Sequence, residues 1–163
     1  MLYAEDLVEG HTYELGSYVV TRDEILSFAG QWDPQDFHTD DAAAAKGFFG
    51  EVIASGIHTL AVFQRLSVLG AYNRWAVIAG RTLRDVQFRS PVRSDSELSA
   101  TMSVTTVLLQ RPDRALVVTT GQLASAHALV LDAEFEMYVR RRPQRLENLL
   151  AQSNRLRHPR EAN

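Results

Sequence analysis

Residues 55–72, SGIHTLAVFQRLSVLGAY, restrict the possible folds of this chain more than any other stretch. At helical spacing, apolar side chains cover nearly every side of this segment. A helix that is apolar almost all round is usually buried, so the rest of the chain must wrap around it. Ser55 is placed to cap the first turn. The sequence therefore predicts a central helix, with apolar positions Ile57, Leu60, Ala61, Val62, Phe63, Leu66, Val68 and Leu69.

Four later segments have the pattern of β-strands: residues 83–88, 97–109, 114–124 and 128–139. The last is the clearest, because apolar side chains occupy every second position and mostly polar ones stand between them. We expect these four strands to form a meander, with one short strand before them near 12–20. An antiparallel sheet must bury its apolar face, and the central helix is the available cover. We therefore predict an α+β fold of the hotdog type, an antiparallel sheet wrapped around a long central helix.

Two short helices are predicted before the central one. Residues 21–24, TRDE, match a capping box, and Gly30 is placed to end the helix that follows. Residues 39–47 form the second helix, with Thr39 or Asp40 as its cap. The chain between these helices, residues 31–41, is QWDPQDFHTDD.

The length of 163 residues suits one domain. We assign residues 1–140 to a single domain and residues 141–163 to a basic C-terminal tail, partly helical or disordered. Residues 140–163 hold seven Arg and two Glu, so the rest of the chain carries a net charge of about −8. A basic tail on an acidic body either contacts nucleic acid or a membrane, or is a solvated extension. We favour the second interpretation and expect neither a nucleic-acid nor a membrane partner.

Composition narrows the setting further. The absence of Cys excludes disulfides, iron–sulfur clusters and thiol nucleophiles, and fits a cytoplasmic location. The first ten residues lack the basic and apolar regions of a signal peptide, and no apolar run reaches the roughly 18 residues of a membrane span. The edge strand of the expected sheet needs a partner, which predicts a homodimer or a higher homo-oligomer.

The stretch before the central helix contains an Asp and a His five residues apart, Asp33 and His38. Pro34 stiffens the bend between them, so both side chains can face one point. A carboxylate beside an imidazole can hold a water molecule and take its proton near neutral pH. From the spacing alone the pair has another interpretation, in which the Asp is a helix cap and the His is an ordinary loop residue.

Ser55 and Gly56 begin the central helix. The first N–H groups of a helix have no intrahelical acceptor and lie at the positive end of the helix dipole. Because Gly56 has no side chain, a ligand oxygen can approach its N–H closely. This is the chemistry of an oxyanion hole for a thioester carbonyl, although Ser-Gly also occurs as a plain helix start.

The segment WDPQDFHTDDAAAAKGFFGEVIASGIHT resembles the MaoC-like acyl dehydratases, a family that includes the (R)-specific enoyl-CoA hydratases. The likeness extends from about residue 5 to residue 139 and includes FRSPVRSDSEL at 88–98. Gln35 stands where many hydratases carry Asn. The residues that carry the resemblance are Asp33, Pro34, Phe37, His38, Phe49, Gly50, Ala54, Ser55 and Gly56.

The resemblance implies the hotdog fold and reversible hydration of a trans-2-enoyl thioester to an (R)-3-hydroxyacyl thioester. It implies that Asp33 and His38 are the catalytic pair, and we assign Ser55, Gly56 and Gln35 to substrate binding. No metal and no cofactor is expected, apart from the coenzyme A or acyl carrier protein that carries the substrate. Two alternatives stay open: a thioesterase on the same fold, and a non-catalytic subunit that binds acyl thioesters within a hetero-oligomeric dehydratase.

Several other side chains have two interpretations. His58 either faces the cleft or packs in the helix start, and Trp32 and Phe37 either pack the loop or contact an acyl chain. Four arginines bind coenzyme A phosphates or form a solvent face: Arg81, Arg84, Arg89 and Arg93. Four apolar residues line an acyl tunnel or belong to the core: Leu60, Phe63, Val86 and Phe88.

Overall fold

The structure, a computed structural model, describes residues 1–143. Five antiparallel strands form one sheet in the order β1-β3-β4-β5-β2. Their bounds are β1 Thr12–Val20, β2 Val77–Phe88, β3 Ser96–Leu108, β4 Arg114–Ser125 and β5 Leu129–Arg140. The predicted meander is therefore wrong in one respect: β3, β4 and β5 are consecutive neighbours, but β2 crosses to the far edge and pairs with β5.

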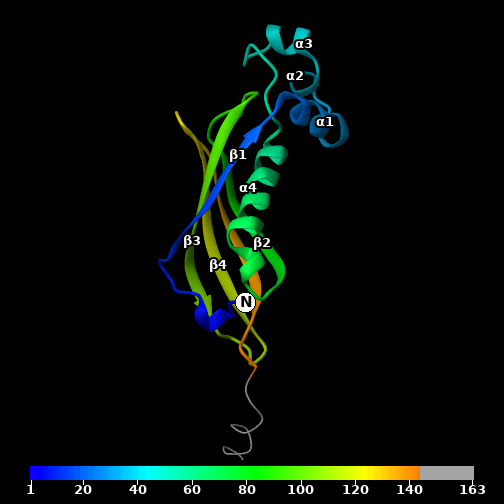
Figure 1. The fold of residues 1–163 in the computed structure, drawn as a ribbon. Helices are drawn as coiled ribbons and strands as arrows, with labels where there is room; N and C mark the ends of the chain where they lie inside the picture. Colours follow the sequence, from blue (N-terminus) through cyan, green and yellow to red (C-terminus); the bar gives the residue numbers. More distant parts are fainter. Residues whose placement is uncertain (144–163) are drawn as a thin grey trace, which may run out of the picture.

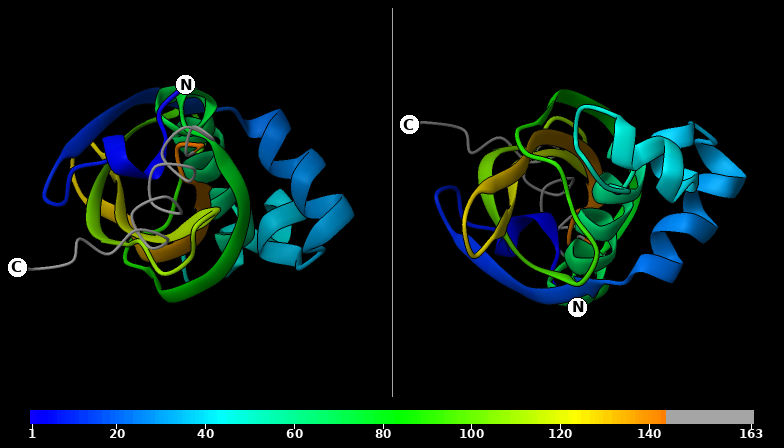
Figure 2. Two further views of the ribbon diagram at one scale, coloured as in Figure 1. Left: turned by 90° about the horizontal axis from the view of Figure 1, so that it is seen from below. Right: turned by 90° about the horizontal axis from the view of Figure 1, so that it is seen from above.

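The long helix α4, Gly56–Gly70, lies along the concave side of this sheet (Figure 1). Viewed from either end, the strands curl around it (Figure 2). Short helices precede it and lie beyond one end of the sheet: α1 Arg22–Trp32, α2 Asp36–Thr39 and α3 Asp41–Lys46. Two 3₁₀ turns complete the fold, η1 Ala4–Asp6 and η2 Tyr72–Arg74. The predicted α+β fold, a sheet wrapped around a central helix, is confirmed.

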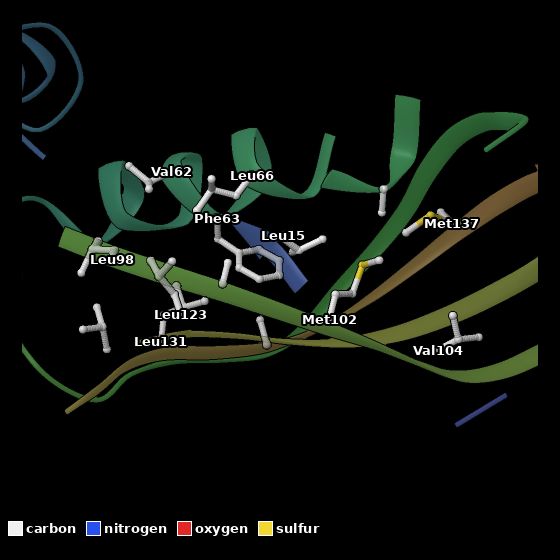
Figure 3. Packing of buried hydrophobic residues seen from close by; sticks show 14 of the residues in the cluster. Leu15, Val62, Phe63, Leu66, Leu98, Met102, Val104, Leu123, Leu131 and Met137 are labelled. Atoms are coloured by element: carbon white, nitrogen blue, oxygen red, sulfur yellow. The ribbon is translucent and has the colours of Figure 1, made fainter. Parts of the chain in front are cut away.

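The core lies between α4 and the sheet. Phe63 points from α4 toward the strands, among leucines of β3, β4 and β5 (Figure 3). Its ring stacks on Phe135 of β5, with centroids 5.1 Å apart. The backbone of β4 at Gly121 makes room for this ring, because a Cβ there would lie 2.0 Å from the Phe63 Cζ atom. A side chain at residue 121 would therefore push the central helix away from the sheet.

The predicted caps are present. Thr21 and Glu24 form the capping box of α1, and Asp40 caps α3. Helix α1 continues two residues past Gly30, which leaves the Trp32 side chain 71% exposed rather than packed in the loop. Phe37 does pack, with its ring 4.2 Å from that of His38.

The edge strand β2 begins at Val77, six residues before the predicted start, and most of its residues are exposed. Helix α4 is also less enclosed than its sequence predicts, because Ile57 is 56% exposed and Leu69 is exposed too. Irregularities interrupt the β2–β5 register at three places, one of them beside Gly80. This side of the molecule therefore presents an apolar helix face next to a free strand edge.

The C-terminal end of the described chain is tied to its N-terminal turn. Arg141 forms an ion pair with Glu5, and Arg142 forms one with Asp6. The expected basic tail over 141–163 lies, from residue 144 onward, outside the described residues. In residues 1–143 no helix is long and apolar enough to cross a membrane.

Candidate functional site

Asp33 lies at the C-terminal end of α1. Its backbone N–H closes the helix by donating to the Ala29 carbonyl at 2.9 Å. Pro34 follows and has no N–H with which to continue the helix. The chain then makes the single turn α2, where a plain bend was expected, and this turn carries His38. Asp33 and His38 are thus held at the end of one helix and in the next turn of the chain.

His38 is fixed by the strand-like segment that precedes α4. Its imidazole is 5% exposed, and Nδ1 lies 2.7 Å from the carbonyl oxygen of Ile53. A carbonyl can only accept, so Nδ1 carries the proton and Nε2 of the neutral ring has a free lone pair. Ile53 also donates its N–H to the Phe37 carbonyl at 3.4 Å. One residue therefore sets both the position of the His38 loop and the tautomer of its ring.

Asp33 is held by two side chains. The Ser55 hydroxyl donates to Oδ2 at 2.6 Å, and the Gln35 amide donates to Oδ1 at 2.8 Å. These bonds, the Ser55 bond first, lower the pKa of the Asp33 carboxyl below its ordinary value, and His38 adds to the effect. The group is therefore an anion at neutral pH. Ser55 and Gln35 were expected to bind the substrate, but in the structure both side chains contact this carboxylate.

The two side chains face each other across a short gap. His38 Nε2 lies 3.6 Å from Asp33 Oδ2, which is longer than a hydrogen bond. When the imidazole is neutral with its proton on Nδ1, both atoms are acceptors and do not bond to one another directly. A molecule with two O–H donors can satisfy both at once, and water is the smallest. The arrangement is suited to orient one water and to accept one of its protons.

The N-terminus of α4 adjoins this pair through Ser55. The Ser55 side chain is fully buried, and its oxygen also accepts from the Ile57 N–H at 3.2 Å, so one hydroxyl caps α4 and holds Asp33. Gly56 is the first residue of the helix, and its N–H has no acceptor within the helix. The half-exposed Phe88 ring covers Gly56, where a Cβ would lie 3.0 Å from the ring. The amide donor at the positive end of the helix dipole thus directly follows Ser55, the residue that holds the Asp33 carboxylate.

The other candidate residues lie elsewhere. His58 turns away and stacks on Phe28 of α1, with ring centroids 4.6 Å apart. Burial lowers its pKa, so it is neutral at pH 7. All four arginines lie in ion pairs: Arg81 and Arg84 with Glu136, Arg89 with Asp132, and Arg93 with Glu51. No group of three or more acidic or His side chains within residues 1–143 is placed to hold a metal ion.

An apolar groove begins one residue from Gly56. It has a volume of about 480 Å³ and lies between α4 and strands β2 and β5. Leu60 is one of its walls, as the tunnel interpretation predicts, whereas Phe63 belongs to the core and Phe88 covers the helix start. Its apolar lining includes Ile57, Leu60, Ala61, Tyr72, Val77, Leu83 and Met137.

Comparisons with known proteins show which family and which proteins this chain is similar to. Residues 7–127 match the family model described as the MaoC like domain. The chain is 31% identical over 141 residues to the Bacillus subtilis protein named uncharacterized protein YdeM, covering 84% of this chain and 98% of that one.

Two solved structures extend the comparison. The MaoC-like dehydratase from Rhodospirillum rubrum is 33% identical, with a TM-score of 0.80 over 88% of this chain and 100% of the other. The (R)-hydratase from A. caviae involved in PHA biosynthesis shares the fold at 23% identity, with a TM-score of 0.68 over 85% and 99% of the two chains. The fold is the hotdog fold, and the chain belongs to the MaoC-like dehydratase family.

Proposed function

We propose that this protein catalyses the reversible hydration of a trans-2-enoyl thioester to an (R)-3-hydroxyacyl thioester, with Asp33 and His38 as the catalytic pair. The observation that carries the proposal is the 3.6 Å gap between two acceptors, His38 Nε2 and Asp33 Oδ2, beside the N-terminus of α4. The (R) configuration comes from the family resemblance. Coenzyme A or acyl carrier protein supplies the thiol of the substrate.

The first step adds the oxygen. A water that donates to both acceptors has a lone pair free to attack C3 of the enoyl thioester. As the new C–O bond forms, His38 Nε2 takes a proton from this water, and Asp33 stabilises the imidazolium that results. An imidazole suits this exchange near neutral pH, whereas the lowered pKa of Asp33 makes that carboxylate the weaker base.

The second step returns the proton. Attack at C3 moves the electron pair of the double bond toward the thioester oxygen and gives an enolate. The Gly56 N–H stabilises the charge on this oxygen, with the dipole of α4 in support. A proton from the Asp33–His38 pair then passes to C2 and completes the addition. The reverse sequence removes water from the 3-hydroxyacyl thioester.

The groove along α4 supplies the binding site for the acyl chain. Its first residue, Ile57, directly follows Gly56, so a chain that leaves the carbonyl enters the groove at once. Walls such as Leu60 and Leu83 are apolar, and burial contributes about 0.8 kcal/mol for each CH₂ of the chain. Apolar acyl chains of medium or greater length thus suit this groove better than short or polar acyl groups.

The free edge of β2 supports a homodimer. In the described part of the chain β2 pairs on one side only, with β5. Ile78 of β2, which does not line the groove, is exposed beside this edge. A second copy that pairs along β2 would cover both the edge and this side chain. Sedimentation should then give a species of at least twice the 18.3 kDa chain mass, and a monomer at micromolar concentration would contradict the pairing.

One assay separates hydration from the two alternatives. The absorbance of the enoyl thioester is followed for crotonyl-CoA and longer enoyl-CoAs, while free thiol is measured in parallel. We expect the enoyl signal to fall without release of thiol. Thiol release would indicate the thioesterase instead. Tight binding with neither change would indicate the non-catalytic subunit.

A further inference from the structure

The outer face of the sheet, on the side away from α4, carries charged side chains that the proposed reaction does not use (Figure 2). Strands β4 and β5 keep one register from Arg114↔Arg140 to Gln122↔Asp132. In both strands the odd-numbered residues of this stretch face the core, so the even-numbered side chains share the outer face. The charges on this face can therefore be followed along the two strands.

One end of the outer face is basic. Arg114 and Arg140 are register partners, so two like charges stand directly opposite each other, which is unfavourable in a sheet. Arg140 is exposed and has no ion-pair partner within residues 1–143. Within the same range, the ion-pair partner of Arg114 is its own chain neighbour, Asp113. A carboxylate from outside the chain would relieve the repulsion between the two guanidinium groups.

The other end of the same face is an acidic hollow. It has a volume of about 420 Å³, and its walls include Asp85, Asp132 and Glu134. Asp132 is paired with Arg89, but Asp85 and Glu134 have no ion-pair partner in the described part of the chain. At about 3.3 Å per residue, the hollow at Glu134 lies roughly 20 Å along β5 from the basic end.

The middle of the face is neutral. Glu136, only 8% exposed, is held by Arg81 at 3.1 Å and by Arg84 at 2.8 Å. Val118 of β4 is its register partner. Uncompensated charge is thus confined to the two ends of the face, with opposite sign at each.

We propose that the outer face of the sheet binds the same face of a second copy, related by a two-fold axis that runs across the strands. Such an axis reverses the strand direction. Each Arg114–Arg140 pair then lies over the hollow that contains Glu134 and Asp85 of the other copy. A two-fold axis along the strands would place arginines on arginines instead. The contact leaves the free edge of β2 uncovered, so it depends neither on the proposed reaction nor on pairing along β2.

Salt gives the first test. A single exposed ion pair contributes little, so this contact needs several pairs at once and weakens as salt screens them. Sedimentation equilibrium is measured at about 50 mM and about 500 mM NaCl, where the Debye lengths are roughly 14 Å and 4 Å. We expect twice the mass at the lower salt concentration. This means four chains against two if β2 pairs, and two against one if it does not. An equal mass at both salt concentrations would overturn the proposal.

An exchange of charges identifies the occupant as a second copy. Arg140→Glu alone and Glu134→Arg alone each place like charges at both contacts, so each variant should lose the doubling at low salt. In an equal mixture of the two variants, each contact again joins a carboxylate to a guanidinium group, and the doubling should return. Asp23→Arg, an exposed reversal on α1, should leave the doubling unchanged.

The melting temperature of each variant shows that it is folded, and Arg114→Glu takes the place of Arg140→Glu if the latter does not fold. Retention of the doubling by both single variants would overturn the proposal. So would a mixture of folded variants that stays at the mass of its components.

Discussion

Ser55→Ala tests whether the Ser55 hydroxyl supports activity as well as stability, because this hydroxyl makes two different hydrogen bonds. It caps α4 by accepting from Ile57, and it donates to Asp33 at 2.6 Å. Loss of a Ser cap costs about 1 kcal/mol of stability. A hydrogen bond to a charged group contributes about 1.5–3 kcal/mol. Since the Asp33 side chain is 24% exposed, water replaces part of that bond, and about 1.5 kcal/mol is the appropriate value.

The expected loss is therefore about 2.5 kcal/mol, which for a chain of this size lowers the melting temperature by roughly 5–10 °C. The pKa of Asp33 should rise toward its ordinary value, because the Ser55 bond is the largest cause of its depression. With the carboxylate less well held, kcat/KM should fall by about tenfold to a hundredfold. Calorimetry, carboxyl-resolved NMR titration and the enoyl assay measure these three effects.

Thr21→Ala is the matched control. Thr21 caps α1 in the same way, but it contacts Glu24 rather than any residue of the site. We expect a loss of about 1 kcal/mol, an unchanged Asp33 pKa and unchanged turnover. If Ser55→Ala behaves like Thr21→Ala in all three measurements, the link from Ser55 to Asp33 has no functional role and the reasoning fails.

Two other substitutions give expectations of a different kind. Gly56→Ala places a Cβ 3.0 Å from the half-exposed Phe88 ring, which can move aside, so stability should change by less than about 1 kcal/mol. We expect kcat/KM to fall by about tenfold or more, because the new methyl group obstructs the approach of the thioester oxygen to the amide. Equal turnover would remove the Gly56 amide from the mechanism. His58→Phe replaces a buried imidazole whose pKa is lowered in the folded state. Below about pH 6.5 the His58 imidazole binds a proton in the unfolded wild type but binds it less readily in the folded protein. The wild type therefore becomes less stable as the pH is lowered. Unfolding at pH 5 and pH 8 should show a smaller difference for His58→Phe than for the wild type, and an equal difference would contradict the burial argument.

The sequence predicts those parts of the fold that depend on local periodicity. The alternation of β5, the apolar positions of α4 and the capping box at Thr21 all specify structure within a few neighbouring residues. The position of β2 is different. Its first half, VIAGRT, contains Gly80 and an irregular register, so no simple alternation marks its start. The crossover of β2 to the far edge is a long-range pairing choice that no local pattern encodes.

The candidate site shows the same division. The spacing of Asp33 and His38 and the Ser-Gly helix start are visible in the sequence, and the structure brings these residues together. The role of Ile53 is not visible. Ile53 acts through its backbone carbonyl, which any residue possesses. Trp32 does not pack in the loop, because helix α1 continues past Gly30 and leaves this residue exposed.

The central claim is that Asp33 and His38 act on one shared water, and a double-mutant cycle tests it most directly. The values of kcat/KM for hydration are compared for Asp33→Asn, His38→Ala and the double variant, with the exposed Asp23→Asn and His127→Ala as controls. Each single variant should lose at least about 10²-fold, and the double variant should be about as slow as the slower single one, because either change removes the same activated water. A single variant at full speed, or losses that multiply in the double variant, would contradict the account.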